Sequence, residues 1–173
     1  TYEPGSVAKP FTVAMALEKG DITPNSTFEC SGYMEIGGYK IRCHNGAEGT
    51  VTLEKAVAKS CNVTMMKIAQ LVGADDFCEY QRVFNFGLKT NVDLAGEART
   101  ASLVYSADQM GPTDLATNSF GQNFNVTMTQ LASSFCSLIN GGNYYKPHVV
   151  KQIQDDNGNV TETLEQPALT NFT

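Results

Sequence analysis

Apolar residues recur at helical spacing through the first half of the chain and predict four helices. The first spans residues 6–19 and ends at Gly20; Pro10 is tolerated in its first turn, where its missing N–H has no intrahelical partner. Its apolar positions are spread around the axis, which predicts a buried helix. Three further helices are expected at residues 53–58, 63–72 and 75–84.

The second half alternates between loop, helix and strand patterns. Residues 88–126 are rich in Gly, Asn, Thr and Ser and predict a long, structured loop. Thr127 and Gln130 form a capping box before a helix with apolar residues three and four positions apart. The pattern then changes to that of two strands, at 148–153 and 160–164, joined by an Asn-Gly turn. The chain is therefore expected to be α+β and mainly helical.

Composition limits the function without deciding it. A chain of 173 residues with 42% hydrophobic and 17% charged residues fits one globular domain or part of one. A net charge of −6 argues against a nucleic-acid partner, which would require a basic face. No apolar run approaches the roughly 18 residues of a membrane span, and no signal peptide is evident. The first residues already belong to a folded motif, so we expect a longer parent protein.

The five cysteines raise the question of a disulfide or a metal. Cys30 and Cys43 flank a predicted hairpin that turns at Gly37-Gly38. The simplest register places Cys43 opposite Gly32, so the two cysteines are expected to be near each other but not directly paired. A disulfide between them and two free thiols both stay open. No close pair such as C-x-x-C occurs, and the two histidines, His44 and His148, are far apart, so neither a metal nor a cofactor is implied.

Two short motifs carry candidate catalytic chemistry. Ser6 stands three residues before Lys9, just after Pro4-Gly5, and residues three apart on a helix are neighbours. A serine hydroxyl needs a base, and Lys9 can serve only if burial or a nearby cation lowers its pKa. Ser60 and Asn62 form a second motif, Ser-x-Asn. Helix caps (Ser6, Ser60), a solvated lysine (Lys9) and a first-turn residue (Asn62) are the alternative readings.

The order of these motifs and the sequence around them match those of a known family. The chain resembles the transpeptidase domain of penicillin-binding proteins, and within it the monofunctional class B group that serves division, elongation (cell shape) or sporulation. The resemblance implies an α+β fold, the penicillin-binding protein/serine β-lactamase-like transpeptidase fold, here mainly its helical lobe with a small β-hairpin portion and an incomplete central sheet. It rests on four blocks: YEPGSVAKPFTVAMALEKG, VTLEKAVAKSCNVTMMKIA, FGLKTNVDLAGE and SFGQNFNVTMTQLASSFCSLINGGNYYKPHVV.

The resemblance also implies roles for the motif residues. Ser6 would attack the D-Ala-D-Ala end of a peptidoglycan stem peptide, form an acyl-enzyme, and be acylated by β-lactams. Lys9 would act as the base, Ser60 would relay a proton between Lys9 and the leaving group, and Asn62 would orient the substrate amide and the lysine. Serine-type D,D-transpeptidase activity is the expected reaction, and no cofactor is needed.

The family's third motif, Lys-Thr-Gly, is missing from its expected place. The run at residues 89–91, Lys-Thr-Asn, stands too early in the chain to be that motif. Residues 1–173 are therefore expected to form a partial transpeptidase domain, truncated before the Lys-Thr-Gly strand and without the N-terminal anchor region. By itself such a chain should be poorly active or inactive.

The parent is expected at the extracytoplasmic face of the bacterial membrane, held by an N-terminal transmembrane helix and working with other cell-wall synthesis proteins. Three alternatives share the same motifs. A serine β-lactamase needs a glutamate to activate water, and Glu97 lacks the E-x-x-x-N setting. A D,D-carboxypeptidase differs in accepting water rather than an amine. A non-catalytic β-lactam sensor or interaction module would keep the fold as a binding surface.

Overall fold

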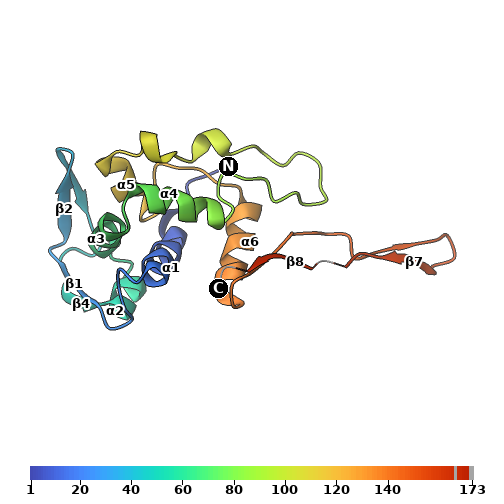
Figure 1. The fold of residues 1–173 in the computed structure, drawn as a ribbon, viewed down its shortest axis with the longest axis horizontal. Coiled ribbons are helices and arrows are strands. Elements are labelled where there is room, and N and C mark those ends of the chain that lie inside the picture. The colour runs from blue at the N-terminus through green and yellow to red at the C-terminus, as the bar shows by residue number, and fades with distance from the viewer. Residues whose placement is uncertain (166, 172–173) are drawn as a thin grey trace.

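Helices α1 (Lys9–Lys19) and α3 (Asn62–Val72) pack against each other in the helical part of the molecule (Figure 1). The computed structural model describes residues 1–165 and 167–171. Helices α4 (Ala74–Val83) and α5 (Pro112–Asn118) contact α3, and α6 (Met128–Ile139) stands beside α1. The remaining helical segments are short: η1 (Gly5–Ala8), α2 (Leu53–Ala58), η2 (Ala101–Leu103) and η3 (Ala107–Gln109).

The strands of the described residues form four separate antiparallel pairs and no larger sheet. The pairs are β1 (Thr27–Cys30) with β4 (Gly49–Thr52), β2 (Tyr33–Ile36) with β3 (Tyr39–Arg42), β5 (Asn143–Tyr145) with β8 (Ala168–Asn171), and β6 (Gln152–Gln154) with β7 (Val160–Thr163). The β6–β7 hairpin projects away from the helices (Figure 1). The predicted α+β, mainly helical architecture is confirmed.

Phe11 anchors the start of α1 in the core. Its ring, 1% exposed, meets those of Phe84, Phe86 and Phe135 edge-on, with centroids 4.9, 5.1 and 6.0 Å away. Such aromatic pairs contribute about 0.5–1.5 kcal/mol each beyond the area they bury. Because Phe11 lies two residues after Lys9, this packing fixes the first turn of α1 against α4 and α6.

The helix predictions for residues 6–84 are confirmed, with two adjustments. The first turn, η1, is a 3-10 helix, and the α-helix begins at Lys9 with Pro10 in its first turn and Gly20 left-handed at its end. Thr52 caps α2 by accepting the Lys55 N–H at 3.2 Å, as predicted. The cap of α3 is Cys61, which the reading of Ser60 as an N-cap missed.

Two predictions for the second half are wrong in part. The expected loop at 88–126 contains α5, whose polar sequence hides it; Pro112 stands in its first turn and Asp114 accepts the Gly111 N–H. The strand expected at 148–153 shrinks to β6, since the N–H groups of Val149 and Val150 donate to Asp93 rather than to a strand partner. The return strand is confirmed as β7.

Within residues 1–165 and 167–171, every helix falls short of the length and apolar character needed to cross a bilayer.

Candidate active site

Three of the predicted site residues meet in one hydrogen-bonded chain. The Lys9 Nζ donates to the Oγ and to the main-chain oxygen of Ser60, both at 2.6 Å. The Ser60 Oγ in turn donates to the Ser6 Oγ at 3.0 Å. The two motifs, 54 positions apart in sequence, thus form a single line from amine to hydroxyl to hydroxyl.

Lys9 is buried, although lysine is rarely so. It is 3% exposed, which excludes the alternative reading of Lys9 as a solvated helix lysine. Desolvation lowers the pKa of the Lys9 amine, and the nearby Cys43 and Cys61 sulfurs partly oppose this effect. Burial disfavours the charged form, so Lys9 is the kind of lysine that can give up its proton and act as a base.

The position of Ser6 depends on a segment far along the chain. Tyr2 pairs with Val126 as an antiparallel bridge, and the Gly5 N–H donates to the Gly121 carbonyl at 2.8 Å. The approach is so close that a Cβ on Gly121 would lie 1.9 Å from the Gly5 oxygen. Ser6, next to Gly5, is therefore held in place by both α1 and the 121–126 segment.

Ser60 has an unusual backbone. Its φ is 55°, in the left-handed region that a residue with a Cβ seldom occupies. This conformation occurs in the turn between α2 and α3, and there the oxygen and the hydroxyl of Ser60 both face the Lys9 amine. Strain of this kind costs about 1–3 kcal/mol and persists where the surroundings enforce it.

Asn62, the fourth predicted site residue, begins α3 and is half-buried. Its Nδ2 donates to the Arg42 carbonyl on β3 at 2.9 Å. This bond ties the Ser-x-Asn turn to the β2–β3 hairpin. The predicted role of Asn62 in orienting the substrate amide and Lys9 stays a prediction.

The Lys89-Thr90-Asn91 run serves a different purpose. The N–H and the hydroxyl of Thr90 donate to one Glu97 oxygen at 2.6 and 2.7 Å, and the Asn91 N–H donates to the other at 2.9 Å. Burial opposes ionisation of Glu97, but these hydrogen bonds together hold its pKa below the usual range. Glu97 thus holds the 90–97 loop together. This supports rejecting Lys89-Thr90 as the family's third motif, and it also supports rejecting Glu97 as a water-activating base.

Sequence reasoning missed a cluster of three cysteines behind the Ser60 turn. The Sγ atoms of Cys30, Cys43 and Cys61 lie 3.1 to 3.6 Å apart, and all three are free thiols. The predicted hairpin register is confirmed, since Ile36 pairs with Tyr39 and the Cys43 N–H donates to the Gly32 oxygen at 2.8 Å. Spacing gave no signal because the members come from three different parts of the fold.

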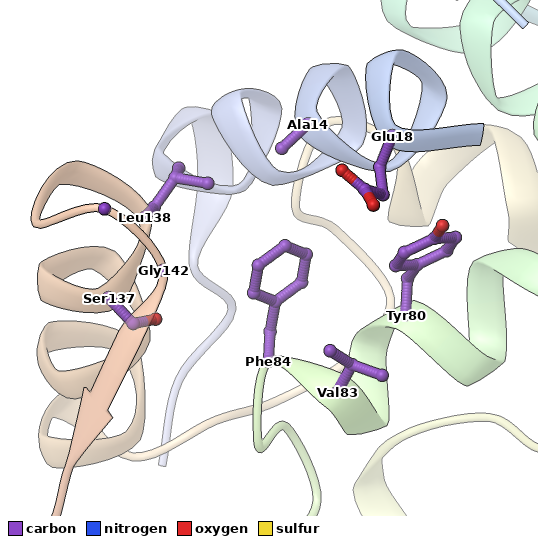
Figure 2. Close-up of a pocket in the computed structure, with 9 residues that line it drawn as sticks. Ala14, Glu18, Tyr80, Val83, Phe84, Ser137, Leu138 and Gly142 are labelled. Carbon is purple, nitrogen blue, oxygen red and sulfur yellow. The ribbon is translucent and has the colours of Figure 1, made fainter. Parts of the chain in front are cut away.

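A cavity of about 290 Å³ lies elsewhere, between α1, α4 and the end of α6. Figure 2 shows the Phe84 ring in its middle, with Glu18 of α1 and Tyr80 of α4 on one side. Ser6, Lys9 and Ser60 take no part in its lining. It therefore does not belong to the candidate active site.

The comparisons with known proteins give the class of this chain, a transpeptidase domain. The sequence matches the penicillin-binding protein transpeptidase domain family over residues 1–172, and the chain belongs to that family. It is 34% identical over 154 residues to Stage V sporulation protein D of Bacillus subtilis, covering 88% of this chain and 24% of that protein. It is 27% identical over 180 residues to the peptidoglycan D,D-transpeptidase MrdA of Haemophilus influenzae, covering 97% and 27%.

The fold agrees with solved structures of the family. The transpeptidase domain of penicillin-binding protein 3 from Burkholderia pseudomallei superposes with a TM-score of 0.81 at 26% identity, covering 92% of this chain and 47% of that one. This confirms the predicted fold. The chain spans about a quarter of the length of the two curated relatives named above.

Proposed function

We propose that the protein containing this chain is a peptidoglycan D,D-transpeptidase that crosslinks stem peptides through an acyl-enzyme on Ser6. The observation that carries the proposal is the line of hydrogen bonds from Lys9 through Ser60 to Ser6. Membership of the family and the name of the Haemophilus relative support the reaction class. As in the family it resembles, the substrate is the D-Ala-D-Ala end of a stem peptide, and β-lactams are the matching inhibitors.

The geometry supports a specific path for the proton. With Lys9 neutral, the two hydroxyls turn so that Ser6 donates to Ser60 and Ser60 donates to Lys9, the reverse of the directions seen here. The Ser6 Oγ then attacks the carbonyl carbon while its proton passes to the Ser60 Oγ, and the Ser60 proton passes to Lys9. The C–N bond then breaks, and the leaving amine of D-Ala takes a proton back through Ser60. An acceptor amine attacks the ester next, gives its proton to the same line, and releases Ser6. The buried position of Lys9 favours its neutral form.

The site of action follows from the same family. We place the protein at the extracytoplasmic face of the bacterial membrane, where peptidoglycan is built, with other cell-wall synthesis proteins as partners. Residues 1–173 supply Ser6, Lys9, Ser60 and Asn62; the substrate-carboxylate site is assigned to a Lys-Thr-Gly strand in the longer protein.

Labelling with benzylpenicillin tests the proposal. The full-length protein should gain one penicilloyl mass, mapped to Ser6 after proteolysis and lasting through the assay. Ser6→Ala should abolish the adduct, and Ser102→Ala, which changes an exposed serine of η2, should retain it. Labelling of another residue would overturn the assignment of Ser6.

Turnover separates the related enzymes. A transpeptidase should release D-Ala from a stem peptide and join the acyl group to an added amine. Rapid hydrolysis of the penicilloyl adduct would indicate a β-lactamase. Release of D-Ala without crosslinking would indicate a carboxypeptidase, and an adduct without either reaction would indicate a sensor.

A further inference from the structure

Three cysteine sulfurs form a nearly regular triangle beneath the Ser-x-Asn turn. The Cys30 and Cys61 Sγ atoms lie 3.1 Å apart, and Cys43 lies 3.6 Å from each. Cys30 and Cys61 are 0% and 1% exposed, and Cys43 is half-buried. The corners come from the end of β1, the residue after β3, and the cap of α3.

Hydrogen-bond donors of α3 point at two of the sulfurs. The N–H of Val63 points at the Cys43 Sγ (3.3 Å), and the N–H and hydroxyl of Thr64 point at the Cys61 Sγ (3.4 and 3.2 Å). These donors belong to the first turn of the 11-residue helix α3, where the helix dipole also favours negative charge. Donors that stabilise negatively charged ligand atoms are what a metal–thiolate site requires around it.

We propose that Cys30, Cys43 and Cys61 bind one Zn²⁺ ion through three thiolates, with a water molecule or another group as the fourth ligand. Zinc–sulfur bonds of about 2.3 Å in tetrahedral geometry hold sulfurs about 3.8 Å apart. The Cys43 edges of 3.6 Å are close to this spacing, and the Cys30–Cys61 edge of 3.1 Å would have to widen when the ion binds. Thiolates select zinc over Mg²⁺ and Ca²⁺, which prefer oxygen ligands. On binding, Zn²⁺ displaces the thiol protons, which leave to solvent.

The triangle favours an ion over a disulfide. A disulfide needs two sulfurs about 2.05 Å apart and would leave the third cysteine unused. Here each sulfur has the other two as neighbours, and a single central ion engages all three at once. The ion would join β1, the β2–β3 hairpin and α3. These three segments meet around Cys61, the middle residue of the Ser-x-Asn motif.

Zinc stoichiometry tests the site in the full-length protein. After reduction, addition of ZnCl₂ and dialysis, about one Zn²⁺ should remain per chain in the wild type. Cys30→Ser and Cys43→Ser should each weaken binding by more than about tenfold, since even changes outside the ligand shell cost roughly 10–100-fold. Cys136→Ser, at an exposed cysteine outside the triangle, should bind like the wild type. Equal binding by Cys30→Ser and Cys136→Ser would overturn the proposal.

Cobalt provides a test that needs no variant. Co²⁺ added to the reduced wild-type protein should give the intense near-ultraviolet sulfur-to-cobalt absorption of a thiolate site, and Zn²⁺ should displace it. A protein that binds neither ion and whose intact mass is two hydrogens below the reduced value would show that the cysteines form a disulfide instead.

Discussion

The Gly5 N–H donates to the carbonyl of Gly121 at 2.8 Å, and the two main chains touch with no room for a side chain between them. The residue before the proposed nucleophile, Ser6, is therefore fixed by the segment that precedes α6. This contact and α1 together fix the position of Ser6.

Gly121→Ala tests that contact. The added Cβ would lie 1.9 Å from the Gly5 oxygen, and the φ of +85° already disfavours alanine. We expect the free energy of unfolding to fall by about 1–3 kcal/mol and acylation of Ser6 to slow, because Gly5 must move. Gly158→Ala, with φ +83° and open space around it, is the matched control and should leave acylation unchanged. Equal acylation rates for both variants would contradict this account.

Lys9→Arg tests the base. Arginine keeps the positive charge but cannot lose a proton, so acylation by benzylpenicillin should fall by about 10²–10⁴-fold. Lys67→Arg is the control, because Lys67 also donates to a main-chain oxygen, that of Glu29, but is only half-buried. Stopped-flow or mass-spectrometric acylation rates provide the measurement, and a Lys9→Arg protein as fast as Lys67→Arg would exclude Lys9 as the base.

Replacing Ser60 separates its hydroxyl from its backbone. Ser60→Ala and Ser60→Gly both remove the relay, so both should slow acylation by about 10²–10⁴-fold. Glycine accepts the φ of 55° without a Cβ clash, so Ser60→Gly should be more stable than Ser60→Ala by about 1 kcal/mol in urea unfolding. A Ser60→Gly protein that acylates normally would show that the backbone, rather than the hydroxyl, is what the site needs.

Glu97 should make the free energy of unfolding decrease as the pH falls. Its pKa is lower in the folded state than the reference value of 4.5, so its contribution is complete above that value and is lost as pH falls through the folded pKa. Glu97→Gln should remove this part of the acid dependence, measured as unfolding free energy from pH 7 to pH 3. Glu162→Gln, an exposed carboxylate on β7, should retain it. Parallel pH curves for wild type and Glu97→Gln would contradict the prediction.

Residues 1–173 alone should be a slow acylator. Thr90 is occupied by Glu97, so the early Lys-Thr run cannot serve as the carboxylate-binding motif. We expect benzylpenicillin to label Ser6 much more slowly in this chain than in the full-length protein, compared at equal concentration by intact mass. Equal rates would show that these residues form a complete site.

The grouping of Ser6, Lys9 and Ser60 was predictable, because residues three apart in a helical turn are neighbours and because the family resemblance linked both motifs. The left-handed φ of Ser60 was not, since no sequence signal distinguishes a strained serine from a capping one. Helix α5 was not predicted because it is short and polar and lies within a segment whose composition is typical of a loop. The strand at 148–153 was overestimated since Asp93, distant in sequence, accepts two of its N–H groups.

The cysteine triangle was unpredictable for a related reason. Its three cysteines are far apart in sequence. They come together only because β1, the β2–β3 hairpin and α3 fold around one point. Metal-ligand spacing rules find sites that one loop or one helix assembles. These rules cannot detect sites whose ligands come from separate elements.

Cys61 occupies the middle position of the Ser-x-Asn motif, a place that the motif's notation leaves unspecified. Here its side chain turns inward, caps α3 and touches two other sulfurs, while its neighbours on either side serve the site and the hairpin. Because Cys61 is 1% exposed, a larger side chain at this position would crowd the turn that carries the proposed relay hydroxyl of Ser60. In this chain, the unspecified letter therefore carries a packing requirement of its own.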